Sequence, residues 1–432
     1  MRRDTMTPGR LLAPLALLAA GAAAMLPLVA KAEPVPAATP KVSSVPGWSD
    51  LIGKLSDLPD RMLARLPEAM RRDPQVQQEV ARLALESLTS QGVDAIGGDA
   101  DAPEFLPAIN YLFNVGQPNA DTVYRTARVA GGGSYRLRGK AGSLNQAIIS
   151  QVVPRNAETG TGRTHIDLAK LKLDKLGRFD VLLSPEKPKG YRGEWWQLRP
   201  QASRLMIRMV SSDWAREQAP TLSIERLDKP VARYRRSAPD LEARLKALAS
   251  QVDMMALLFV DHVEKLRAEG YVNKLKVFDI TSAGGLSGQF YYEGAYDLAD
   301  DEALIVESEL PKVCRYRSLI LTNELYETTD WYNNHSSLNN AQARPDKDGK
   351  LRIVIANRDP GVPNWLDTAG HARGLVQGRW MDCSSNPVPQ VKKVRLTELR
   401  QHLPADTGTV TPEQRQTIIR ERRAAHAQRP IW

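Results

Sequence analysis

Two groups of short apolar segments, separated by one long amphipathic stretch, constrain the fold of this chain most. In the first group, residues 146–153 (QAIISQVV) and 204–212 (RLMIRMVSS) are rich in branched and long apolar side chains. The second group includes residues 316–325 (YRSLILTNEL) and 351–357 (LRIVIAN). Short strands at this spacing, bounded by Gly, Pro and Lys loops, are typical of β-sandwiches or barrels. The sequence therefore predicts a mainly β protein with helical additions.

The stretch between the two groups predicts a helix. Apolar residues recur there at steps of three and four, which places them on one stripe: Leu241, Leu245, Leu248, Val252, Met255, Phe259 and Leu266. Pro239 and Gly270 stand where a helix begins and ends. His262 lies on the same stripe, so we expect it to pack rather than to catalyse.

The N-terminus has the pattern of a secretory signal peptide. A basic start (residues 1–10) precedes an apolar run (residues 11–30) and a small-x-small site at Ala30-Lys31-Ala32. Cleavage there predicts an exported, periplasmic protein, and the alternative is a retained membrane anchor. No later run approaches the ~18 apolar residues that a membrane span needs. Export and the lack of a binding motif argue against nucleic acid as a partner, even though the formal net charge is +9.

These features predict a domain plan. It consists of a signal peptide (1–32), a flexible Pro/Ala/Ser linker (33–47), helices followed by a first β domain (48–237), a helical segment (238–273), a second β domain (274–395) and a basic helical tail (396–432).

The two cysteines, Cys314 and Cys383, stand at ends of predicted strands. In an oxidising compartment they can form a disulfide. The alternative is a pair of buried free thiols, and a metal site built from two lone cysteines is less favoured than either.

Two segments carry a family resemblance. NELYETTDWYNNHSSLN and ANRDPGVPNWLDTAGHARGLVQGRW resemble the bacterial family called domain of unknown function 1214. PNADTVYRTARV, followed by GGGSYRLRG, is similar to the partner domain of unknown function 1254. The resemblance implies β-sandwich domains of jelly-roll type, which agrees with the two β units, separated by the helical segment, that the residue patterns predict. It implies no reaction and no catalytic residues.

The candidate site is a set of polar and aromatic residues at the ends of the C-terminal strands, which we expect to meet at one rim. Asp330, His335, Asp359 and His371 are the candidates for acid–base catalysis. Rings and hydrogen-bonding groups that suit a polar ligand are Trp331, Asn333, Arg358, Asn364, Trp365 and Asp367. The structural alternative is that Asp and Asn cap turns and Trp fills the sandwich.

No standard catalytic signature, such as a nucleophile elbow, zinc helix, P-loop or dinucleotide fingerprint, occurs in the chain. We therefore predict no cofactor and no metal, and leave open whether the protein is an enzyme. The favoured hypothesis is an envelope protein that binds or processes a polar, carbohydrate-like or acidic small molecule. The alternative is a non-catalytic periplasmic interaction or structural protein that contacts a partner through its basic tail.

Overall fold

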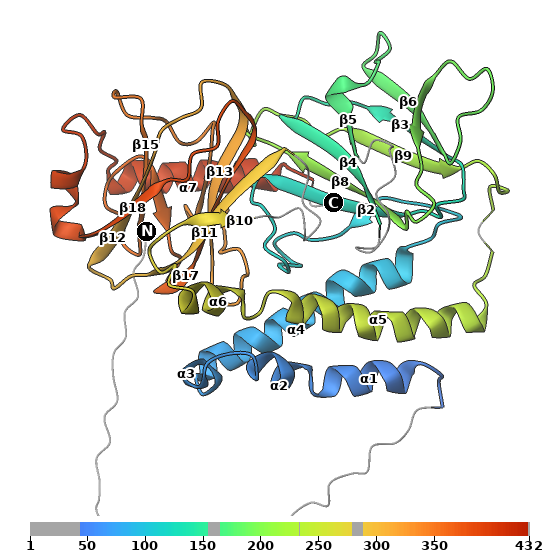
Figure 1. Ribbon diagram of the computed structural model, residues 1–432, viewed down its shortest axis with the longest axis horizontal. Helices are drawn as coiled ribbons and strands as arrows, with labels where there is room; N and C mark the ends of the chain where they lie inside the picture. Colours follow the sequence, from blue (N-terminus) through green and yellow to red (C-terminus); the bar gives the residue numbers. More distant parts are fainter. Residues whose placement is uncertain (1–43, 154–164, 233, 279–287, 431–432) are drawn as a thin grey trace, which may run out of the picture. The chain divides into compact units, whose positions relative to one another are not determined.

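The computed structural model describes residues 44–153, 165–232, 234–278 and 288–430. The predicted signal peptide and most of the predicted linker lie outside these ranges. In the described part, two strand-rich regions flank a helical segment (Figure 1), which confirms the mainly β prediction. No helix among the described residues is long and apolar enough to cross a membrane.

The first strand-rich region is a sandwich of two sheets, ordered β1-β2-β8-β4-β5 and β7-β6-β3-β9. Side chains from both sheets, among them Leu137, Leu183 and Leu205, form one buried core. The strands are β1 (Leu106–Pro107), β2 (Thr122–Arg128), β3 (Tyr135–Lys140), β4 (Gln146–Val152), β5 (His165–Asp167), β6 (Arg178–Ser184), β7 (Glu194–Gln197), β8 (Arg204–Val210) and β9 (Thr221–Arg226), with a 3-10 turn at Leu168–Lys170.

The second region repeats this plan with sheets ordered β10-β11-β17-β13-β14 and β16-β15-β12-β18. Its core combines Leu319, Val376 and Trp380 of one sheet with Leu304 and Ile355 of the other. The strands are β10 (Lys276–Phe278), β11 (Gln289–Asp297), β12 (Glu302–Ser308), β13 (Cys314–Thr322), β14 (Ser337–Asn339), β15 (Leu351–Ala356), β16 (Trp365–Asp367), β17 (Arg373–Cys383) and β18 (Gln390–Arg395), followed by a 3-10 helix at Leu396–His402.

The predicted disulfide is confirmed. Cys314 opens β13, Cys383 closes β17, and the two residues are direct partners in the antiparallel register. The bridge therefore joins two neighbouring strands of one sheet at their common end.

A layer of helices packs beside the sandwiches (Figure 1). Its core contains Leu58, Val80 and Val252, and it reaches the second sandwich through Leu325. Asp73 and Ser237 cap the two longest helices by accepting backbone N–H groups. The helices are α1 (Trp48–Ser56), α2 (Leu58–Leu63), α3 (Glu68–Arg71), α4 (Pro74–Gly97), α5 (Ala238–Leu258), α6 (His262–Ala268) and, near the C-terminus, α7 (Pro412–Ala427).

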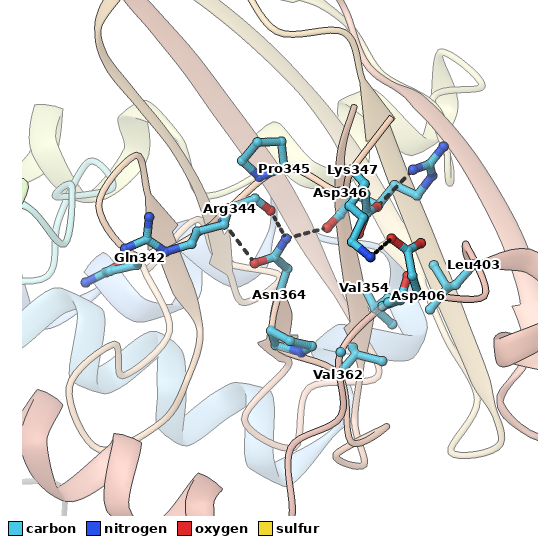
Figure 2. Close-up of a pocket in the computed structure, with 14 residues that line it drawn as sticks. Gln342, Arg344, Pro345, Asp346, Lys347, Val354, Val362, Asn364, Leu403 and Asp406 are labelled. Atoms are coloured by element: carbon cyan, nitrogen blue, oxygen red, sulfur yellow. Dashed lines mark hydrogen bonds and ion pairs between the residues drawn. The ribbon is translucent and has the colours of Figure 1, made fainter. Parts of the chain in front are cut away.

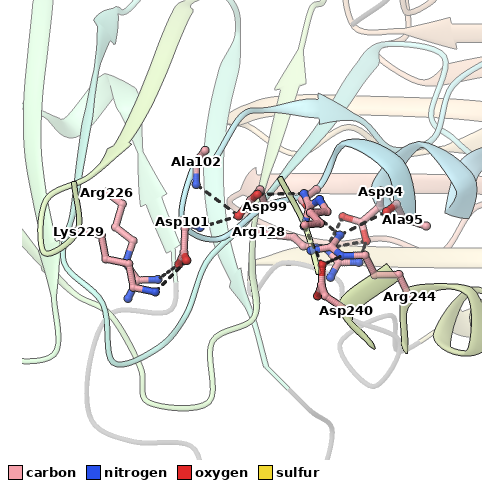
Figure 3. A network of polar contacts seen from close by, with 12 residues as sticks. Asp94, Ala95, Asp99, Asp101, Ala102, Arg128, Arg226, Lys229, Asp240 and Arg244 are labelled. Atoms are coloured by element: carbon pink, nitrogen blue, oxygen red, sulfur yellow. Dashed lines mark hydrogen bonds and ion pairs between the residues drawn. The ribbon is translucent and has the colours of Figure 1, made fainter. Parts of the chain in front are cut away.

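Ion pairs attach the end of α4 to its surroundings (Figure 3). Asp94 accepts hydrogen bonds from Arg128 of β2 and Arg204 of β8, both at 2.6 Å. In the loop after α4, the Gly98 carbonyl accepts from Arg244 of α5 at 2.7 Å. Asp94 thus links α4 to the first sandwich, and Arg244 links the loop that follows α4 to α5.

Asp94 tests this link. Burial disfavours its charged form, but the hydrogen bonds and charges of Arg128 and Arg204 outweigh burial and lower the pKa of Asp94. A lowered pKa in the folded state adds stability above the unfolded value of ~3.9, and this stability is lost as the pH falls through the folded pKa. We expect Asp94→Asn to lower the free energy of unfolding at neutral pH by about 2 kcal/mol in urea titrations, and the deficit to shrink in acid. Asp180→Asn, which removes an exposed ion pair with Arg136, should cost below about 1 kcal/mol. Equal costs for the two variants would contradict this role of Asp94.

Candidate functional site

The structure distributes the predicted site residues over several places. Asp330, Trp331 and His371 line one pocket of about 260 Å³ between α4 and the loop from β13 to β14. His335 and Trp365 lie in the protein core, and Asn364 lines a separate depression. The pocket with three of the predicted residues is the candidate functional site.

The floor of this pocket is a buried carboxylate, Glu327, which is 1% exposed. Its position is set by Asn323, whose side-chain oxygen accepts the backbone N–H groups of Leu325 and Glu327 and whose amide donates to the Glu327 carboxylate at 2.7 Å. Such a side-chain-to-backbone turn fixes the loop locally. Glu327 therefore points toward α4 from a rigid turn.

Helix α4 supplies the opposite wall. Arg82 donates to both oxygens of Glu327 at 3.1 Å. Glu86, one turn further along, lies 3.6 Å from Arg82 and accepts the backbone N–H of Asn114 at 3.0 Å. One arginine thus stands between two carboxyl groups.

This arrangement raises the proton affinity of the pair. Burial, followed by the charge of Glu327, raises the pKa of Glu86 to about 7, although Arg82 opposes the shift. Burial also raises the pKa of Glu327. Two nearby carboxyl groups in a poorly solvated place titrate as a coupled pair. With a pKa of about 7, Glu86 is protonated in part of the molecules near neutral pH.

Aromatic rings border the carboxyl pair. Tyr111 contacts Trp331 edge-on and also contacts Tyr332, which stacks on His426 with ring centroids 4.3 Å apart. Trp331 is buried, and its indole N–H has no hydrogen-bond partner in the structure. The pKa of His426 is lowered to about 4, mainly by burial and to a smaller extent by the charges of Arg429 and Arg422. The ring therefore stays neutral at physiological pH.

Helix α7 holds the aromatic residues from behind. Arg415 and Arg422, seven residues apart, lie on one face of α7, and Arg429 follows shortly after the helix ends at Ala427. Arg422 is buried, donates to the Trp331 carbonyl and the Ser337 hydroxyl, and covers the ring of Trp214 at 4.4 Å. The basic tail predicted from the sequence thus turns these arginines inward.

The remaining predicted residues near the pocket have local partners. Asp330 is exposed and accepts the backbone N–H groups of Tyr332 and Asn333 and the side-chain amide of Asn333. His371 is partly exposed at the pocket wall, and burial lowers its pKa. Asp330 therefore closes a turn and also lines the pocket.

His335 lies away from the pocket. It is 5% exposed, stacks on Trp365 and donates from Nδ1 to the Trp365 carbonyl, which can only accept. Burial, with smaller effects of Arg422 and Arg415, lowers its pKa to about 3. Asp359 pairs with Arg415 at 2.9 Å, and Arg415 covers the Trp365 ring. These contacts attach α7 to the second sandwich.

Asn364 lines a different depression of about 360 Å³ (Figure 2). Its amide donates to the carbonyls of Arg344 and Arg352, and its oxygen accepts the Arg344 N–H. Lys347 pairs with Asp406 across the same depression. The side chain of Asn364 is thus occupied in joining two backbone segments.

Arg358 and Asp367 do not reach the pocket. Arg358 is exposed and lies 3.6 Å from Asp300. Asp367 accepts the Ala369 N–H, while its own N–H donates to the His335 carbonyl. The three predicted loops therefore adjoin through backbone and core contacts, and their side chains do not meet at a single rim.

Sequence reasoning missed the carboxyl pair. Glu327 lies inside the quoted segment NELYETTDW, but it looks like one of several loop acids. Arg82 and Glu86 lie on the polar side of α4, and their spacing of four places them on one helix face. Only the packing of α4 on the loop brings them to Glu327. In the described part of the chain, no cluster of three or more His, Cys, Asp or Glu side chains could hold a metal ion.

Comparison with known proteins agrees with the C-terminal assignment. Residues 295–376 match the family described as protein of unknown function DUF1214. This segment runs from β11 into β17 and contains Glu327, Asp330, Trp331 and His371. The C-terminal part of the predicted resemblance is confirmed. The N-terminal resemblance stays a prediction.

One solved structure extends the similarity to most of the chain. An uncharacterised protein from Burkholderia cenocepacia is 26% identical with a TM-score of 0.74, and the match covers 81% of this chain and 97% of that one. The VPA0106 protein from Vibrio parahaemolyticus is 12% identical with a TM-score of 0.43, and the match covers 73% of this chain and 99% of that one; this similarity is too low to carry a structural argument. No curated protein matches the chain.

The raised pKa of Glu86 makes a prediction about stability. Because the folded state binds this proton more tightly than the unfolded state, the contribution is complete below the ordinary value of 4.5 and is lost as the pH rises through about 7. We expect the free energy of unfolding to increase from about pH 8 to about pH 5, and Glu86→Gln to reduce this increase. Denaturant titrations at several pH values measure it. Glu225→Gln, at an exposed carboxylate paired with Arg138, is the control, and an unchanged pH profile in Glu86→Gln would contradict the assignment.

Arg422 tests the role of α7. Arg422→Ala leaves the Trp331 carbonyl and the Ser337 hydroxyl without their donor, so we expect a loss of about 3 kcal/mol in unfolding free energy. Arg420→Ala, on the exposed side of the same helix, should stay within about 0.5 kcal/mol of the parent protein. If both variants unfold at the same denaturant concentration as the parent protein, Arg422 does not anchor the helix.

Proposed function

We propose that this protein is an exported envelope protein that binds a hydroxyl-rich, carbohydrate-like small molecule in the pocket between α4 and the β13–β14 loop. The observation that carries this proposal is the carboxyl pair of Glu86 and Glu327 beside the ring of Tyr111. Sugar hydroxyls donate well to carboxylate oxygens, and aromatic rings cover the apolar faces of sugars.

The charge of the pocket favours a neutral ligand over an acidic one. The residues that line the pocket include one arginine, Arg82, and three acidic residues: Glu86, Glu327 and Asp330. An anion would meet like charges there, whereas hydroxyl groups find acceptors. The sequence suggested either a carbohydrate-like or an acidic ligand. The charges of this pocket favour the neutral, carbohydrate-like ligand.

Glu86 is also the group best suited to move a proton. With a pKa of about 7 it exchanges a proton at neutral pH, which is the property that general acid–base catalysis requires. Binding is the proposed function, and turnover of a bound ligand would use this carboxyl group.

Export is the second part of the proposal. The basic start, the apolar run over residues 11–30 and the Ala30-Lys31-Ala32 site support it. Fractionation of the cells that produce the full chain, with N-terminal sequencing of the product, measures both cleavage and location. Recovery of an uncleaved chain in the cytoplasm would reject the export proposal.

The binding test uses thermal unfolding with glucose, N-acetylglucosamine and maltose as probes. A sugar present at 1,000-fold its dissociation constant should stabilise the parent protein by about 4 kcal/mol. Glu86→Gln and Tyr111→Leu should weaken binding at least about tenfold, and Glu225→Gln should not. If none of the three sugars shifts the transition, or if all variants bind alike, the proposal fails and the non-catalytic interaction protein becomes the better hypothesis.

A further inference from the structure

A second group of buried polar residues lies where the two sandwiches face each other. Tyr316 of β13 and Met381 of β17 pack with Ile148 of β4 and Val210 of β8 in one apolar cluster. The sheet β1-β2-β8-β4-β5 and the sheet β10-β11-β17-β13-β14 therefore contact each other through their outer faces. Side chains two residues apart on a strand share a face. Each of these faces therefore carries an arginine: Arg379 beside Met381 on β17, and Arg208 beside Val210 on β8.

Arg379 is the arginine of the second sandwich. It lies between Tyr291 and Ser318 in the sheet register and is 4% exposed. Its guanidinium covers the Tyr291 ring at 4.7 Å and donates to the Tyr291 oxygen at 3.4 Å and to Gln377 at 3.0 Å. Its Nε has no hydrogen-bond partner.

No carboxylate of the described residues forms an ion pair with Arg379. Glu293, which lies on the same strand as Tyr291, is fully buried and is hydrogen-bonded to His262 at 2.8 Å and Gln377 at 3.2 Å. A buried guanidinium without a counterion is costly, because neither water nor an anion replaces its lost hydration. The position therefore calls for an anion.

Arg208 is the arginine of the first sandwich. It lies between Tyr124 and Ile148 in the register, keeps partial exposure and donates to the Ser150 hydroxyl at 3.2 Å. Burial lowers its pKa, and the phenols of Tyr124 and Tyr291 partly offset this effect. The same two phenols also act on Arg379, so both tyrosines lie near both arginines.

We propose that the two facing sheets hold the anionic group of a small organic acid, with Arg379 and Arg208 as the cations and Tyr124 and Tyr291 as hydrogen-bonding neighbours. Guanidinium groups bind carboxylate and phosphate oxygens through paired N–H donors, so both oxyanions fit this chemistry. Tyr124, Ser150 and Arg208 are partly exposed while Tyr291 and Arg379 are buried, so the first sandwich supplies the more accessible groups of the site and the second supplies the buried ones. The site needs both sandwiches, and it is separate from the acidic pocket at α4.

The experiment uses the mature protein and measures binding of citrate, inorganic phosphate and glucose by calorimetry at low salt. Citrate or phosphate should bind, and any binding of glucose should be unaffected by Arg379→Gln, because a sugar belongs to the pocket at α4. The stronger of the two anions distinguishes a carboxylate from a phosphate ligand. Arg379→Gln and Arg208→Gln should each weaken anion binding at least about tenfold. Arg136→Gln, which removes an exposed guanidinium paired with Asp180, should leave it unchanged.

Two of the variants keep the outcomes separate. Arg208 is the more exposed of the pair, so Arg208→Gln tests the proposal even if Arg379→Gln does not fold. Glu86→Gln should leave anion binding intact, which separates this site from the proposed sugar pocket. The proposal is overturned if neither anion binds, or if Arg136→Gln weakens binding as much as Arg208→Gln, since the anion would then respond only to overall charge.

Discussion

The structure depends most on one buried carboxylate, Asp121, which is 1% exposed. It accepts hydrogen bonds from Trp214 at 2.8 Å, Asn339 at 2.8 Å and Tyr316 at 2.6 Å. Trp214 belongs to the first sandwich, and the other two residues belong to the second. A buried carboxylate must receive such donors to offset its lost hydration. The hydrogen bonds of Asp121 therefore join the first sandwich to the second.

The C-terminal helix is joined to the same place. Arg429 donates to the carbonyls of Ala120 and Asp121 at 2.8 and 2.7 Å, while Arg415 pairs with Asp359 in the second sandwich. The α7 segment thus crosses from one sandwich to the other. Its arginines are buried by aromatic rings and carbonyls, so this face of the basic tail serves the chain's own structure.

The acidic pocket and the arginine pair are two results of this packing. Both combine side chains that are distant in sequence: Glu86 with Glu327, and Arg208 with Arg379. Under the two proposals, a neutral hydroxyl-rich group binds at the acidic pocket and an anionic group binds at the arginine pair.

Residue patterns predicted much of the fold. The short apolar segments are strands of the two sandwiches, and the stretch 241–266, with apolar residues at steps of three and four, forms α5 and α6. The two cysteines at strand ends form a disulfide. His262, which the stripe placed in a packing role, instead binds the buried Glu293 carboxylate as well as its aromatic neighbours. The apolar periodicity predicted the direction of the His262 side chain. Its partner, Glu293, lies on a different element, β11.

The sequence by itself determined which segments are strands or helices, because side-chain periodicity records which face of an element is buried. It also determined that the segment around Asp330 is rich in polar and aromatic groups. Only the tertiary structure decided which of these groups share a pocket. Asp330, Trp331 and His371 gather with Arg82, Glu86 and Glu327, whereas His335, Trp365 and Asn364 support the core and the loops. The physical reason is that burial and charge pairing act between elements that are far apart in the chain, and local periodicity carries no information about such partners.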